Sequence, residues 1–135
     1  MTKFTSVTPN LLVRDVAKSL EFYRDVLGFK MTQTVPDVEP FVFVMLERDG
    51  VMVFLNDINA AALDYPDADT LKAGGTAAMF FMISDVDAYH AIVAPKTTVI
   101  LPLKTQFYGL REFAITDPDS HILTFAERVT PEAEP

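Results

Sequence analysis

The sequence predicts an α+β fold in which two βαβββ repeats form a curved, mostly antiparallel eight-stranded sheet. Each half of the chain contains a strand, then an aspartate, then an amphipathic helix, and the two aspartates, Asp15 and Asp85, lie 70 positions apart. Three further strands follow each helix in the same order. One such repeat is too small to bury both faces of its own sheet, so two repeats are expected to pack together.

The composition limits the class of protein. With 135 residues, 50% of them hydrophobic, the chain can form one domain with its own core. The absence of cysteine excludes disulfides and thiolate metal sites and favours a reducing, cytoplasmic compartment. A net charge of −8 argues against a nucleic-acid partner and against an anionic membrane surface. The apolar runs are far shorter than the about 20 residues that cross a bilayer.

The order of the elements predicts one domain, 1–128, followed by a flexible tail, 129–135. Within the domain, repeat one covers about 4–57 and repeat two about 76–128. A connector, about 58–75, joins the repeats. Its aspartates and terminal glycines are typical of a loop, and part of it could form a short helix.

The first repeat begins with an alternating strand over 4–13. Apolar residues at helical spacing follow Asp15, whose carboxylate can accept hydrogen bonds from the first turn. Gly28 can end this helix in a left-handed conformation. Asp49 and Gly50 are typical of a two-residue hairpin. The strands after the helix are predicted at 29–34, 41–47 and 51–56.

The second repeat is predicted to match the first at a separation of 70, so that Phe43 corresponds to Phe113 and Asp49 to Asp119. Asp85 is expected to cap its helix, which Pro95 should end. The remaining elements are a strand over 76–84, the helix over 85–94, a strand region over 97–105 that is broken by Pro102, and strands over 111–117 and 121–127.

Two stretches carry a resemblance to a known family. The first is LLVRDVAKSLEFYRDVLGF, which has a strand, an Asp, Ser-x-x-Phe-Tyr and Leu-Gly-Phe; the second is YGLREFAITDPDSHILTFAE, which has Tyr-Gly, an aromatic strand, an Asp-Pro-Asp turn and a final strand. In both, the chain resembles the glyoxalase, bleomycin-resistance and extradiol-dioxygenase superfamily, also called vicinal oxygen chelate proteins. Ser120 stands where that pattern has glycine. The resemblance covers about residues 4–128 and implies the glyoxalase/bleomycin resistance fold and a homodimer.

The resemblance also implies where a metal would bind. Enzymes of that superfamily hold a divalent metal in the cup of the sheet with His, Glu or Gln side chains, one near the start and one in the last strand of each repeat. These positions fall on Thr8, Phe54, Ala78 and Thr124. None of the four supplies the carboxylate or imidazole that divalent cations require. The expected branch is therefore the bleomycin-resistance-like one, with no metal site, no cofactor and no catalytic residues.

Other residues that could bind a metal have structural explanations. His121 should point to the opposite face of its strand from Thr124, and His90 should be a partly buried histidine on the inner side of the second helix. Asp117 and Asp119 are explained by the chemistry of a turn.

The cup lining that follows from period-two alternation is apolar and aromatic, with a few amides and hydroxyls. Arg111 either binds an anionic group of a ligand or pairs with a surface carboxylate near Glu112. The alternative for the lining is an ordinary filled core. The candidate ligand-binding residues are Thr8, Asn10, Phe54, Asn56, Phe80, Tyr108, Arg111 and Thr124.

These patterns favour a metal-free protein of the bleomycin-resistance type that sequesters a small organic molecule, a drug or a metabolite, in the sheet cup. A metal-dependent lyase, isomerase or dioxygenase of the same superfamily is the alternative function. A third interpretation is an interaction module whose cup is filled by its own side chains.

Overall fold

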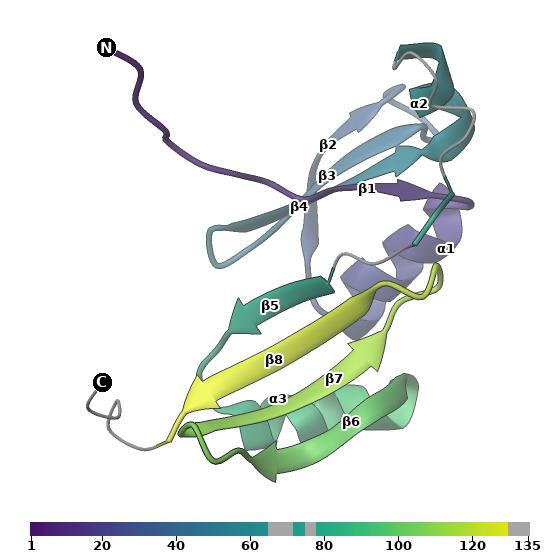
Figure 1. Cartoon of the computed structure of the whole chain (residues 1–135). Helices are drawn as coiled ribbons and strands as arrows, with labels where there is room; N and C mark the ends of the chain where they lie inside the picture. The colour runs from purple at the N-terminus through teal and green to yellow at the C-terminus, as the bar shows by residue number, and fades with distance from the viewer. Residues whose placement is uncertain (65–71, 75–77, 130–135) are drawn as a thin grey trace. The chain divides into compact units, whose positions relative to one another are not determined.

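The computed structural model describes residues 1–64, 72–74 and 78–129. The chain divides into two units, Met1–Gly74 and Gly75–Pro135 (Figure 1). The part of the predicted connector over 65–71, the glycine at 75 and most of the predicted tail lie outside the described residues. Within the described ranges, no helix has the length and apolar character needed to cross a membrane.

The first unit contains a four-stranded sheet in the order β1-β4-β3-β2. β1 (Asn10–Val13) runs parallel to β4 (Val51–Asp57). β3 (Phe43–Arg48) runs antiparallel to β4 and to β2 (Lys30–Val35). β1 is shorter than predicted, because Pro9 has no N–H and only its carbonyl joins the ladder, accepting from Phe54 at 2.9 Å.

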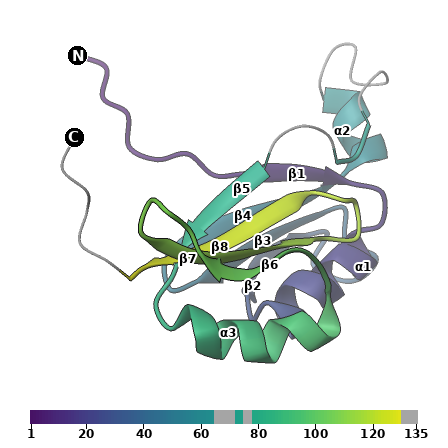
Figure 2. The ribbon, with the colours of Figure 1, turned by 60° about the horizontal axis from the view of Figure 1, so that its bottom comes forward.

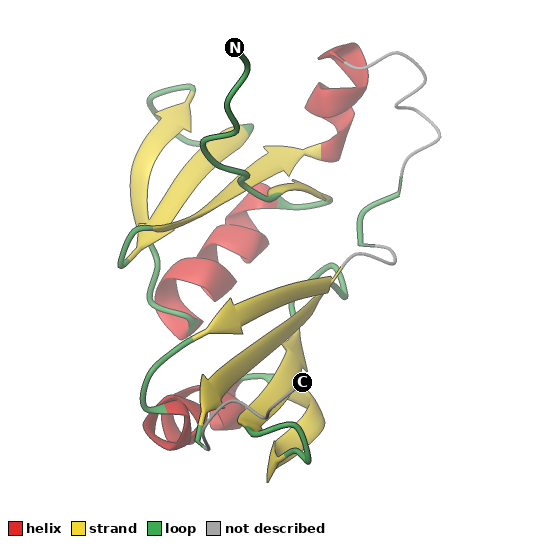
Figure 3. Cartoon of the chain, turned by 60° about the vertical axis from the view of Figure 1, so that its left-hand side comes forward, coloured by secondary structure: helices red, strands yellow, loops and turns green. Residues whose placement is uncertain are grey.

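One helix covers one face of this sheet (Figure 3). α1 (Val16–Glu21) begins after Asp15, whose Oδ1 accepts from the backbone N–H of Lys18 at 3.1 Å, so the predicted cap is confirmed. The helix continues as a π turn (Phe22–Val26) and ends at Gly28, at φ 86°. The side chains that the sheet turns toward α1 are fully buried: Val13, Val44, Leu46, Val53 and Leu55. The short helix in the predicted connector is present as α2 (Ile58–Asp64).

The second unit repeats this topology, with strand order β5-β8-β7-β6. β5 (Ala78–Met82) runs parallel to β8 (Ile122–Arg128). β7 (Leu110–Thr116) runs antiparallel to β8 and to β6 (Thr98–Thr105). β6 continues through Pro102, contrary to the predicted break, because an edge strand tolerates a residue without an N–H where its register shifts.

α3 (Val86–Val93) covers one face of the second sheet, and a 3₁₀ turn (Ala94–Lys96) follows it (Figure 2). Under α3 the core is aromatic. Phe125 stacks on Phe81 at 5.1 Å between ring centroids and meets Phe113 at 5.4 Å. Tyr89 of α3 packs on the same cluster, 5.1 Å from Phe125. This face of the sheet is therefore filled within its own unit.

The strand registers agree with the predicted 70-residue repeat in the parallel strand pairs, but not in β7. Asn10 pairs with Phe54 in the first unit and Phe80 with Thr124 in the second, a separation of 70 in both strands. β7 departs from this separation. Asn56 pairs with Phe43, whereas Ala126, 70 positions after Asn56, pairs with Glu112 and not with Phe113.

The cause of this shift is the hairpin. Only Asp49 and Gly50 separate the last paired residues of β3 and β4, whereas 117–121 separate those of β7 and β8. In the longer loop, the backbone N–H of Asp117 donates to the carbonyl of His121 at 3.1 Å. The turn inside this bond, 118–120, is still one residue longer than the Asp49–Gly50 turn of the first hairpin. The predicted match of Phe43 with Phe113 is therefore wrong by one position. Asp49 and Asp119 lie in the two hairpin loops, where no strand pairing tests their predicted match.

The predicted cap of α3 is also wrong. Asp85 makes no side-chain capping bond and has φ 55°, in the left-handed region. The carboxylate of Glu127 in β8 takes its place, with Oε2 accepting from the N–H of Asp85 and Oε1 from that of Val86, both at 3.1 Å. A strand residue thus fixes the start of the helix that packs on its own sheet.

Glu127→Ala is expected to lower the free energy of unfolding by about 1–2 kcal/mol, because two N–H groups at the start of α3 lose a charged acceptor. Asp85→Asn is the matched control. Its side chain makes no capping bond, and asparagine tolerates the left-handed backbone, so a change within about 0.5 kcal/mol is expected. Urea unfolding would measure both. A larger loss for Asp85→Asn than for Glu127→Ala would contradict the capping assignment.

Candidate functional site

The predicted ligand-binding residues of the first unit lie on the face of the sheet opposite α1. Asn10 pairs directly with Phe54, and Asn56 lies two residues further along β4, so all three share this face. Phe43 of β3 contacts Phe54, with ring centroids 5.3 Å apart. Thr8 precedes β1 and is half-buried. The first unit therefore brings two amides beside an aromatic pair.

The second unit has a more exposed counterpart on the face opposite α3. Phe80 and Thr124 pair across β5 and β8, and Ala114 pairs with Thr124 from β7. Phe80 and Met82 are each 56% exposed, unlike the buried aromatic cluster on the other face. A flat apolar surface with a hydroxyl at its centre suits stacking by an organic ring and one or two hydrogen bonds.

The four positions at which the resemblance implies metal ligands do not fit a metal. Phe54 and Thr124 lie within the ladders of the two sheets, Ala78 begins β5, and Thr8 precedes β1. Their side chains offer two hydroxyls, a ring and a methyl group. In the parts of the chain that the structure describes, no three His, Asp or Glu side chains come together in a group that could hold a metal ion.

Tyr108 is hydrogen-bonded to Glu112, a residue that the sequence analysis missed. Tyr108 lies in the turn before β7, and its hydroxyl donates a hydrogen bond to Oε1 of Glu112. This bond to a carboxylate raises the pKa of the Tyr108 hydroxyl above its usual value. Glu112 is buried on the face opposite α3, because it takes the place that Phe43 has in the first unit. The longer hairpin at 117–121 was the signal that could have identified it.

Arg111 does not share the sheet face of Phe80 and Thr124. It lies on the α3 side of β7, where its guanidinium makes a bidentate pair with Asp87 of α3 at 3.0–3.1 Å. This hydrogen-bonded pair lowers the pKa of the Asp87 carboxyl. Of the two roles considered for Arg111, the structure shows an ion pair with a surface carboxylate, and Asp87 is that carboxylate.

The histidines have structural surroundings. His90 packs edge-on against Phe113, with centroids 4.9 Å apart. His121 is buried in the β7–β8 turn, where its Nδ1 lies 2.8 Å from Oδ2 of Asp117. The other oxygen of Asp117 accepts from the N–H groups of Asp119 and His121 at 2.9 and 2.8 Å. The bond to Asp117 raises the pKa of His121.

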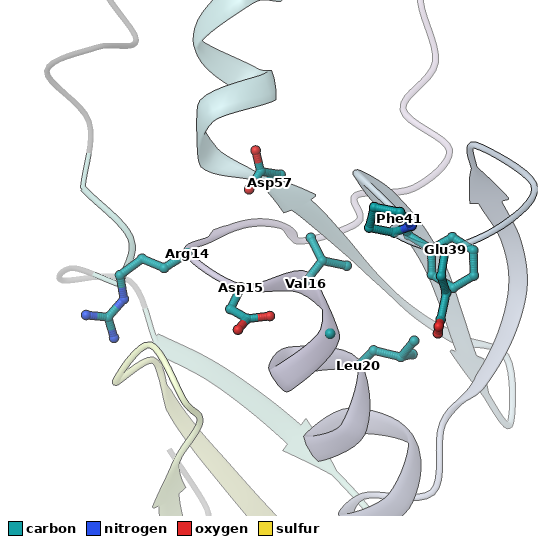
Figure 4. Close-up of a pocket in the computed structure, with 9 residues that line it drawn as sticks. Arg14, Asp15, Val16, Leu20, Glu39, Phe41 and Asp57 are labelled. Carbon is teal, nitrogen blue, oxygen red and sulfur yellow. The ribbon is translucent and has the colours of Figure 1, made fainter.

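A separate pocket of about 500 Å³ lies in the first unit (Figure 4). None of the predicted site residues lines it. Two of its carboxylates already act as caps, since Asp15 accepts from Lys18 and Oδ2 of Asp57 accepts from Ala60 at 3.0 Å. The lining consists of Arg14, Asp15, Val16, Ala17, Leu20, Glu39, Pro40, Phe41 and Asp57.

Comparison with known proteins agrees with the geometry. The model of a family described as the glyoxalase/bleomycin resistance protein/dioxygenase superfamily matches residues 4–125. A bleomycin resistance protein of Geobacillus stearothermophilus is 26% identical over 131 residues, which cover 90% of this chain and 95% of that protein.

Solved structures show the same fold. A protein of unknown function from Agrobacterium tumefaciens str. C58 has a TM-score of 0.73 and 29% identity, and the match covers 94% of this chain and 96% of that one. TnmS3, an antibiotic binding protein from Streptomyces sp. CB03234, has a TM-score of 0.73 and 21% identity, with 95% and 98% covered. The predicted α+β class with two βαβββ repeats is confirmed.

The His121–Asp117 pair predicts how stability depends on pH. Because the folded-state pKa of His121 lies above its ordinary value of 6.5, the folded chain binds this proton more tightly than the unfolded chain. The stabilisation is complete below about pH 6.5 and is lost as the pH rises through the folded-state pKa. Urea unfolding between about pH 6 and pH 9 should show this decline.

His121→Gln is the control for this pH dependence, because it removes the titrating ring and keeps the backbone N–H that Asp117 accepts from. The variant should show a flatter profile over the same range. An unchanged decline in His121→Gln would assign the pH dependence to another group.

Proposed function

Because the chain belongs to the glyoxalase/bleomycin resistance protein/dioxygenase superfamily, we propose that it is a metal-free protein that binds and sequesters a small organic molecule. The ligand lies on the sheet face of the second unit that is opposite α3. The molecule is a drug or a metabolite with a flat, apolar part that can stack on aromatic side chains. We further propose that the chain acts as a homodimer in the cytoplasm.

The observation that carries this proposal is the exposed apolar surface opposite α3. Phe80 and Met82 project from β5, and Ile122 from β8, into space that no helix of their own unit covers. Exposed apolar side chains that are adjacent, and not scattered singly, mark binding surfaces in soluble proteins. Thr124, between them, can fix the orientation of a bound molecule by a hydrogen bond.

The comparisons support this class of function. The matched relative from G. stearothermophilus is a bleomycin resistance protein, and TnmS3 is an antibiotic binding protein. Both names point to binding of an organic compound. A metal-dependent lyase, isomerase or dioxygenase would need ligands that Thr8, Phe54, Ala78 and Thr124 do not supply.

A thermal-shift screen of cationic antibiotics and aromatic metabolites tests the proposal, followed by titration of each hit by isothermal calorimetry. Phe80→Ala should weaken a hit at least about tenfold, because the central aromatic contact is lost. Ile92→Ala is the matched control, because Ile92 is an equally exposed apolar residue (58%) on α3.

Affinity that is the same in Phe80→Ala, in Ile92→Ala and in the unchanged protein would contradict binding on this face. A complete absence of hits with the unchanged protein would count against sequestration itself.

A further inference from the structure

Glu112 lies in the middle of a row of side chains that crosses the sheet of the second unit. Its partner across β8 is Ala126, which in turn pairs with Met82 of β5. Its partner across β6 is Lys104. Directly paired residues share a face, so this row lies opposite α3, on the same face as Phe80 and Thr124. The next residue, Phe113, points the other way, toward α3.

The carboxylate of Glu112 is only half satisfied. The residue is 4% exposed, and Oε1 accepts from the hydroxyl of Tyr108. Oε2 is buried and has no hydrogen-bond partner in the described part of the chain. Burying a carboxylate oxygen without a donor is unfavourable, and such oxygens are almost always paired in folded proteins. A donor from outside the chain would remove this cost.

The neighbouring cations of the second unit do not fill this role. Arg111 adjoins Glu112 in sequence but is held on the α3 side by Asp87. Lys104 lies directly opposite Glu112, and Arg128 lies on the same face two residues after Ala126. Both are exposed, and no ion pair joins either of them to Glu112 among the residues described. A positively charged group on a ligand would therefore find an oxygen that is buried, ionisable and unpaired.

We propose that Glu112 is the counter-ion for a cationic amine, amidine or guanidine group of the bound organic molecule. This inference rests on the proposed function, and it specifies the class of ligand. Oε2 accepts the hydrogen bond from the cation, Tyr108 holds the carboxylate in place through Oε1, and the apolar part of the ligand lies toward Phe80.

The geometry of the sheet sets the size of this ligand. Phe80 lies on β5 and Glu112 on β7, so two strand spacings, about 10 Å, separate them across the sheet. Along the strands their registers differ by two residues, about 7 Å. Both side chains extend over the face and shorten this span. The ligand should therefore carry its charge on an arm of several atoms beyond its ring system. The 43% exposed Tyr108 adds an aromatic surface beside the charge.

Three dansyl probes test this inference on the intact chain. Dansylcadaverine carries a ring system and a five-carbon arm that ends in an ammonium group. Dansyl hexylamide has a methyl group in that place, and dansyl aminohexanoate has a carboxylate. Fluorescence titration should show that the cation binds about tenfold more tightly than the neutral probe, with the anion weakest, as a charge-assisted hydrogen bond predicts.

Glu112→Gln should abolish this preference and leave the affinity for the neutral probe within about twofold, because only the charge is removed. Glu21→Gln removes the same charge from the exposed surface of α1 and should change neither affinity. The melting temperature of Glu112→Gln without ligand should stay close to that of the unchanged protein, because glutamine keeps the shape of the side chain and an oxygen that can accept from Tyr108.

The outcomes separate the two proposals. Binding of the probes without regard to charge, or a preference for the cation that survives Glu112→Gln, would overturn the role of Glu112 and leave the proposed function standing. Equal losses of melting temperature in Glu112→Gln and Lys104→Met would show a structural ion pair and overturn it as well. No binding of any probe would count against the proposed function, and this inference would fail with it.

Discussion

Each unit of this protein has a sheet with two faces and a principal helix that covers one of them. Under α1, Val13, Val53 and Leu55 have no exposure, and under α3 the aromatic cluster around Phe125 closes the second core. The opposite faces receive no such cover from their own unit. They still carry large side chains, of which Phe80 and Met82 remain more than half exposed. Keeping such residues in contact with solvent costs free energy, and this cost is the reason for proposing a binding role for them.

The same constraint explains why the chain needs a definite signal for the start of each helix. Each helix must begin at a fixed residue, because the apolar side chains it presents match one face of the sheet only. In the first unit this signal is local, since Asp15 caps α1 three residues ahead of Lys18. In the second unit it is not local, since Glu127 reaches α3 from a strand more than forty positions away in sequence.

This difference shows which parts of the fold could be predicted from the sequence. The strands, the helices and the 70-residue separation followed from hydrophobic periodicity and from Asp and Gly residues at the ends of elements. The capping role of Glu127 could not follow, because it depends on the pairing of β8 with its neighbours. The one-position shift at β7 also escaped, because similar Asp-containing turns of different length were aligned with each other.

Part of the candidate site could also be predicted from the sequence, because the alternation of side chains along a strand sets which residues share a face. The prediction that Asn10, Phe54 and Asn56 share one face of the first sheet, and Phe80 and Thr124 one face of the second, is confirmed by the strand registers. Two roles were left open for Arg111, and its ion pair with Asp87 on the other face is the one with a surface carboxylate. Glu112 was overlooked because the shift at β7 changes the face to which each of its residues points.

The central claim is that the metal-ligand positions of the superfamily carry side chains that cannot bind a metal, and that the sheet faces hold an organic molecule without one. Inductively coupled plasma mass spectrometry of the purified chain tests this claim most directly, after exposure to nickel, zinc, manganese and iron(II) and subsequent desalting. A metal content far below one ion per chain is expected for each metal. A content near one ion per chain would contradict the claim and would favour a metal-dependent enzyme of the same superfamily.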